Sequence, residues 1–133
     1  MEATGRIYPS FFQSIFEGEV QAKNLTCMLL NNDGVFNIEH SNISDLVPFE
    51  IDFEDYSRKE LENVTMDLDE GKILLDSSNI DFGEEVTITA SNAVIYDNIN
   101  QKLLYHLNFD EEAKSYKGKF EIAVEDGIIR IVV

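Results

Sequence analysis

The 133-residue chain contains one cysteine, no tryptophan, two prolines and only ten Lys and Arg residues. With a single cysteine, Cys27, it cannot form an intramolecular disulfide. Cys27 stands in the apolar run LTCMLL at residues 25–30, and a cysteine in such a run is far more often a small buried side chain than a nucleophile. We therefore expect Cys27 to belong to the core.

The shortage of basic residues excludes one class of partner. Ten Lys and Arg stand against 26 Asp and Glu, which gives a formal net charge of −16. Nucleic-acid binders need a basic surface to displace counterions from phosphates, and a surface this negative repels a polyanion. We expect no direct binding of DNA or RNA. The charge should also keep free copies soluble and apart.

Long apolar runs are missing as well. No segment approaches the roughly 20 apolar residues that cross a bilayer as a helix. Residues 1–6 lack the basic start and apolar stretch of a signal peptide. We expect no membrane association, and synthesis in the cytoplasm.

The sequence does contain enough apolar material for one folded unit. Its hydrophobic fraction is 44%, with nine Phe and five Tyr, and its length is typical of a single domain. No internal repeat or low-complexity linker divides it. Residues 1–133 are therefore predicted to form one domain with an acidic surface.

Helical spacing of apolar residues occurs near the N-terminus. Pro9 is tolerated in a first helical turn and Gly18 is suited to end a helix, so a short amphipathic helix is predicted at about residues 9–17. Its apolar side chains exceed what a face of about 100° hides against one surface. Either a partner or a longer loop of the same chain should cover the rest. The candidate partner-binding residues are Ile7, Tyr8, Phe11, Phe12 and Phe16.

After this helix, apolar and polar residues alternate with a period of two, which is typical of half-buried strands. The predicted strands lie near residues 25–30, 47–53, 64–68, 73–75, 86–95, 103–109, 120–124 and 128–133. Pro48 favours an edge position for one of them, and Asp126-Gly127 is a strong hairpin signal. About eight strands with short turns predict an all-β fold, an antiparallel β-sandwich or jelly roll.

Three local features complete the predicted fold. Beyond Asn92 apolar residues occupy both strand faces, which indicates either a β-bulge or burial on both sides. Residues 41–46 are predicted to form one helical turn, and residues 55–60 a charged loop. The predicted core includes Phe49, Ile51, Val94, Leu107, Phe120 and Ile122.

The sequence has little that could support catalysis. His40 and His106 are its only histidines, and no nucleophile elbow, phosphate-binding glycine loop or Cys-His metal spacing is present. His40 is predicted to lie in a loop and His106 on the solvated face of its strand. Residues 67–71 imitate the opening of an EF-hand loop, but the later ligand positions are not filled. We expect no enzyme, cofactor or metal, although acids from distant segments could still converge.

Five segments, taken in order, resemble a group of small structural proteins of tailed phages. They are residues 4–12 (TGRIYPSFF), 25–30 (LTCMLL), 93–97 (AVIYD), 103–109 (LLYHLNF) and 126–131 (DGIIRI). The resemblance runs from about residue 4 to the end. It is weakest at residues 52–62, where this chain has acids and Arg58-Lys59 in place of the group's Gly and Thr. The matching residues determine fold and carry no chemical signature.

The resemblance implies a virion component that acts by binding other proteins. The leading hypothesis is a capsid decoration or cement protein, which docks on and bridges major capsid protein subunits in many symmetric copies. A neck, tail or head-fibre accessory protein is the alternative. A third hypothesis, from another class, is a carbohydrate-binding or glycan-hydrolysing module, and the lack of tryptophan counts against it.

Overall fold

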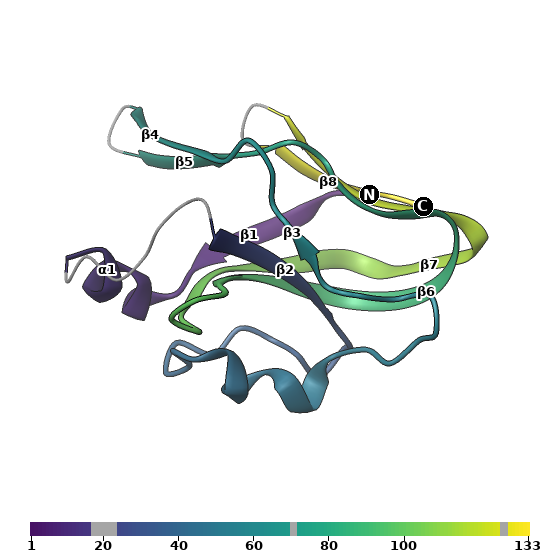
Figure 1. The fold of residues 1–133 in the computed structure, drawn as a ribbon, viewed down its shortest axis with the longest axis horizontal. Coiled ribbons are helices and arrows are strands. Elements are labelled where there is room, and N and C mark those ends of the chain that lie inside the picture. The colour runs from purple at the N-terminus through teal and green to yellow at the C-terminus, as the bar shows by residue number, and fades with distance from the viewer. Residues whose placement is uncertain (17–23, 70–71, 126–127) are drawn as a thin grey trace.

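The computed structural model describes residues 1–16, 24–69, 72–125 and 128–133 (Figure 1). Antiparallel strands dominate these residues, which confirms the predicted all-β class. The predicted N-terminal helix is also present, as α1 (Pro9–Phe16). Short 3-10 helices, η2 (Ile43–Asp45) and η3 (Val47–Phe49), follow later in the chain.

One sheet of six strands contains most of the β structure. Its order is β1 (Ala3–Ile7), β7 (Leu103–Glu125), β6 (Ile80–Asp97), β2 (Leu25–Leu30) and β3 (Lys59–Glu60), and β8 (Ile128–Val132) pairs with the later part of β7. A separate two-stranded ribbon consists of β4 (Thr65–Asp69) and β5 (Lys72–Asp76). The two predicted hairpins are confirmed as antiparallel pairs. Their turns, residues 70–71 and 126–127, lie outside the described residues.

The β6–β7 ribbon is much longer than the sequence pattern suggested. The predicted strands at 103–109 and 120–124 are two ends of the single 23-residue strand β7. Register shifts interrupt its pairing with β6, and such bulges bend a strand. Figure 1 shows the ribbon curving over at one end of the sheet. Because the hydrogen-bonded order is that of one sheet, the finer assignment as a sandwich or jelly roll stays a prediction.

The bend closes the main core of the protein. It brings Phe82 and Phe120, which meet edge to face with ring centroids 5.9 Å apart, into the same apolar cluster as Leu29 and Leu107. Predicted core residues in this cluster are Ile51, Leu107, Phe120 and Ile122, and all are buried. Cys27 is buried there too, and burial raises the pKa of its thiol to about 12. The thiol is therefore a core side chain, as predicted.

A second apolar cluster lies on the other face of β2 and of the end of β6. Met28 and Val94 face this cluster, while their neighbours Cys27 and Ala93 face the main core. The pairing register also shifts between Ala90 and Asn92. Burial on two sides therefore accounts for the apolar residues after Asn92, and a break in the pairing register comes just before them.

Residues 31–50 cover the second cluster and lie below the sheet in Figure 1. The predicted helical turn at 41–46 is confirmed as η2, where Asn42 and Asp45 form a capping box. The strand predicted at 47–53 is wrong. Pro48 lies in the first turn of η3, and the chain then contacts β2 through the isolated bridge Leu30–Glu50. Phe49 is only partly buried against the second cluster.

Strand β1 was not predicted. It pairs with β7 in the register Gly5–Leu107 and Arg6–His106. Gly5 is required by a close approach, because a Cβ at this position would collide with the ring of Tyr105. The Gly-Arg-Ile-Tyr segment thus determines how the N-terminus lies on the sheet.

Candidate functional site

The N-terminal segment contains the five residues predicted to bind a partner, and the structure divides them. Tyr8 is fully buried in the second cluster and Phe11 is buried in the main core, while Ile7 is half-buried against that core. Phe12 is 51% exposed and Phe16 is 93% exposed. Tyr8 and Phe11 therefore cannot contact a partner directly, and that part of the prediction is corrected.

Local hydrogen bonding explains this division. The Tyr8 amide donates to the Leu104 carbonyl at 2.9 Å, and the Phe11 amide donates to the Tyr8 carbonyl at 2.9 Å. These bonds hold the start of α1 against β7. Phe12 and Phe16 are four residues apart, so they are neighbours on one helix face. We call these two residues the docking pair.

His106 is buried, although the sequence predicted it on the solvated face of its strand. Its ring is 1% exposed, and its Nε2 donates to the carbonyl of Gly34 at 2.8 Å, since a carbonyl can only accept. Nδ1 has no hydrogen-bond partner among the described residues, and neither does the buried hydroxyl of Tyr8. Burial lowers the pKa of His106, and the charge of Arg6 lowers it further. We call residues 31–50, which cover the second cluster, the covering segment. His106 binds this segment through Gly34, and its buried ring has no access to a substrate.

A polar cluster at the edge of β2 holds residues 50–58 in place. Arg58 binds both carboxylate oxygens of Glu50 at 2.8 Å and also donates to the Tyr96 hydroxyl at 2.9 Å. The Tyr56 hydroxyl donates to Glu50 at 2.6 Å and accepts from the Leu29 amide. Burial opposes ionisation of Glu50, but hydrogen bonds from Arg58 and Tyr56 outweigh it and lower its pKa. Because these groups satisfy one another, we interpret the cluster as structural.

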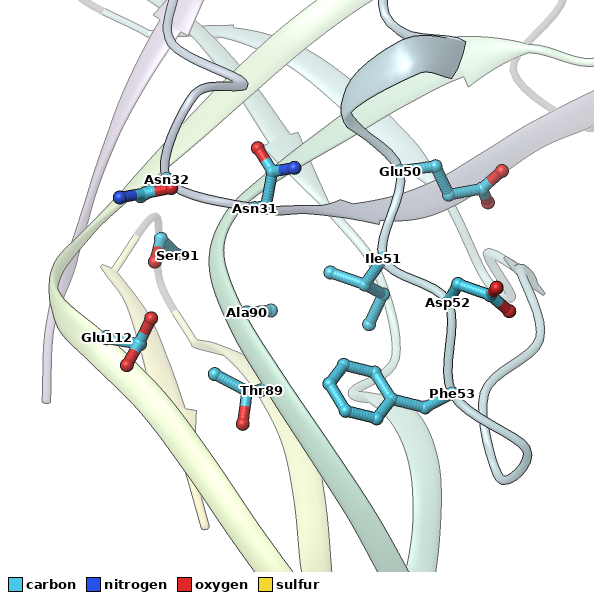
Figure 2. Close-up of a pocket in the computed structure, with 10 residues that line it drawn as sticks. All are labelled: Asn31, Asn32, Glu50, Ile51, Asp52, Phe53, Thr89, Ala90, Ser91 and Glu112. Atoms are coloured by element: carbon cyan, nitrogen blue, oxygen red, sulfur yellow. The ribbon is translucent and has the colours of Figure 1, made fainter.

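A cavity of about 280 Å³ opens beside the break in the β6–β7 pairing register between Ala90 and Asn92 (Figure 2). We call it the bulge cavity. Four separate segments line it, and its lining residues are Asn31, Asn32, Glu50, Ile51, Asp52, Phe53, Thr89, Ala90, Ser91 and Glu112.

The bulge cavity has an apolar and a polar side. Figure 2 shows Ile51 and Phe53 directed towards β6, while the carboxylates of Glu50 and Asp52 point away from the cavity. The opposite side carries Ser91 and Glu112. Sequence reasoning missed this site because its residues come from four distant segments, and the only local signal was the disturbed alternation near Asn92.

Other kinds of site find little support in the described part of the chain. No group of three or more His, Cys, Asp or Glu among the described residues could hold a metal ion. No helix in those residues is long and apolar enough to cross a membrane. Residues 67–69, the start of the EF-hand-like segment, lie in β4. His40 is half-buried in the loop that follows β2.

Comparison with known proteins adds no relative. No protein-family model, curated protein or solved structure matches the chain significantly.

Proposed function

We propose that this chain is a non-enzymatic structural protein that docks on a larger particle. The observation that carries the proposal is the docking pair. A phenylalanine that is 93% exposed, with a second one 51% exposed on the same helix face, leaves apolar surface open to solvent. Exposed aromatic side chains of this kind commonly mark a partner site.

The particle that we propose is a tailed-phage virion, and the protein a capsid decoration protein. The resemblance of five segments to small tailed-phage proteins supports this assignment. Gly5 and Asp97, which belong to the resembling segments, have clear roles in the fold: Gly5 admits the Tyr105 ring, and Asp97 accepts a hydrogen bond from the Ile99 amide at 2.9 Å. Because these two residues act in the fold, their presence in the resembling segments supports a likeness of fold.

The net charge of −16 suits an outer position on the particle, away from packaged DNA. Many copies that each make a modest contact with the major capsid protein would together hold the shell. A neck, tail or head-fibre accessory protein is the alternative, since the same resemblance permits it.

Mass spectrometry and cryo-electron microscopy of purified particles test this proposal. Decoration predicts one copy at each symmetry-equivalent position of the shell. A few copies at a single vertex or along the tail would favour the accessory role. Particles that lack the polypeptide altogether would exclude both.

A further inference from the structure

The bulge cavity has the size and lining of a binding site that docking does not use. We propose that it binds one neutral sugar residue of a glycan. This proposal does not depend on the proposed function, since it concerns a different surface. The cavity of about 280 Å³ is slightly smaller than the pockets of roughly 300–1,000 Å³ that take drug-sized ligands. A single pyranose ring is an appropriate occupant.

The apolar side of the bulge cavity suits the C–H face of a sugar ring. Phe53 is 36% exposed, and Figure 2 shows its ring directed across the cavity towards Thr89 and Ala90, with Ile51 beside it. A sugar ring has one face rich in C–H groups, and its contact with an aromatic ring removes apolar surface from water. Phe53 therefore offers a platform although the chain has no tryptophan.

The polar side offers partners for sugar hydroxyls. The side chains of Asn32, Thr89 and Ser91 line the cavity, and no hydrogen bond ties any of the three to another described residue. An amide and two hydroxyls can each donate and accept, and the Glu112 carboxylate accepts. Within the described residues, the Glu112 carboxylate makes a single interaction, an exposed ion pair with Lys114 at 3.3 Å. A ligand with several neutral hydroxyls can use all four groups.

Strand β6 adds main-chain groups on the same side. The Thr87 amide points away from β7, because it donates to the Asp55 carboxylate at 2.9 Å, whereas the Ile88 amide donates to Ser115 of β7. Alternation along a strand then directs the amide and carbonyl of Thr89 to the same side as those of Thr87. β2 does not pair with β6 there, since its register with β6 ends at Leu30–Asn92. The Thr89 peptide groups are thus available to a ligand.

Charge selects the class of sugar. The chain carries a net charge of −16, and Glu112 lines the cavity itself. Sialic and uronic acids are anions, so this field opposes their approach. A neutral hexose or N-acetylhexosamine carries no such penalty.

Nuclear magnetic resonance of the isotopically labelled full chain tests the proposal. The probes are the methyl glycosides of glucose, galactose, mannose and N-acetylglucosamine, each titrated beyond millimolar concentration. At least one should give saturable amide shifts confined to residues 31–32, 51–53, 89–91 and 112. Phe53→Ala should weaken this binding at least about tenfold, and Thr89→Val should weaken it less. Tyr116→Ala, which removes a 79% exposed aromatic that does not line the cavity, should leave it unchanged.

Three results would overturn the inference. The first is that none of the four glycosides gives localised shifts. The second is that Phe53→Ala binds the glycoside as tightly as the parent does while its spectrum remains that of a folded protein. The third is that agmatine, a guanidinium compound, produces the localised shifts and the glycosides do not, because the cavity would then take a basic side chain. None of these results bears on whether the protein is found in virions.

Discussion

His106 Nε2 lies 2.8 Å from the carbonyl oxygen of Gly34, 72 residues away in the chain. The bond joins β7 to the segment that covers the second apolar cluster. The same ring meets Tyr8 and Phe36 edge to face, and the guanidinium of Arg6 lies 4.1 Å from the centre of the Phe36 ring. A proton on Nδ1 would therefore place a second cation in a buried aromatic setting beside Arg6.

This arrangement predicts that acidification destabilises the protein through His106. Its folded pKa is lowered from the ordinary value of 6.5, with burial as the main cause. At pH values well above 6.5, His106 is neutral in both the folded and the unfolded states. As the pH falls below 6.5, the unfolded state takes up the proton first, so the free energy of unfolding falls by at most about 1.4 kcal/mol per pH unit.

Urea denaturation at about pH 7.5 and about pH 5.5 measures this effect. His106→Gln keeps a donor for Gly34 and removes the titration, so it should lose less stability between the two pH values than the parent. An unchanged pH dependence in His106→Gln would contradict the prediction.

Phe120 should be among the costliest core positions to truncate. It is fully buried in the main cluster and meets Phe82 edge to face. Phe120→Ala should lower the free energy of unfolding by about 3 to 5 kcal/mol, as buried aromatics do. Tyr116→Ala, on the same strand but 79% exposed, should change it by no more than about 0.5 kcal/mol. Equal losses for the two variants would mean that the β7 register is wrong.

Local patterns in the sequence predicted those parts of the fold that depend on neighbours in the chain. The strand at 25–30 follows from a continuous, fully buried run of residues. The two hairpins and the turn capped by Asn42 depend on alternation and on side chains within a few residues. The errors concern long-range contacts. In residues 47–53, Phe49 and Ile51 pack against two different apolar clusters. The resulting alternation of apolar and polar residues is the same as that of a strand, so the sequence alone cannot distinguish the two.

Contacts distant in sequence also explain the misplaced histidine and the missed cavity. His106 alternates as an outward residue should, but the covering segment buries that face and supplies the Gly34 carbonyl. The bulge cavity forms where β2 ends beside β6, which depends on strand register. For the docking residues, helical spacing identified the helix correctly and could not tell which face β7 would cover.

Gly5 is predicted to tolerate no side chain. The ring of Tyr105 occupies the place of a Cβ at this position, so Gly5→Ala should cost about 1 to 3 kcal/mol through overpacking. Tyr105→Ala in the same chain should remove the clash, so the double variant should be more stable than the sum of the two single losses predicts. Thermal unfolding of the four proteins completes this cycle. Strict additivity would show that Gly5 matters for another reason.

The docking pair should affect assembly without affecting stability. Phe12 and Phe16 are exposed on one helix face, whereas Phe11 beside them is 3% exposed in the main core. Phe16→Ser, and separately Phe12→Ser, should leave the melting temperature nearly unchanged, because little buried surface is lost. Both should reduce incorporation into particles, measured as the amount of this chain relative to the major capsid protein.

Phe11→Ser is the matched control for these variants. It places a hydroxyl in the main core and removes a buried ring, so it should lower the melting temperature clearly, and any assembly defect would follow from lost folding. If Phe12→Ser and Phe16→Ser assemble as the parent does, the docking surface lies elsewhere on the protein. If they lose stability as Phe11→Ser does, another part of the chain covers them, and their role is in the core.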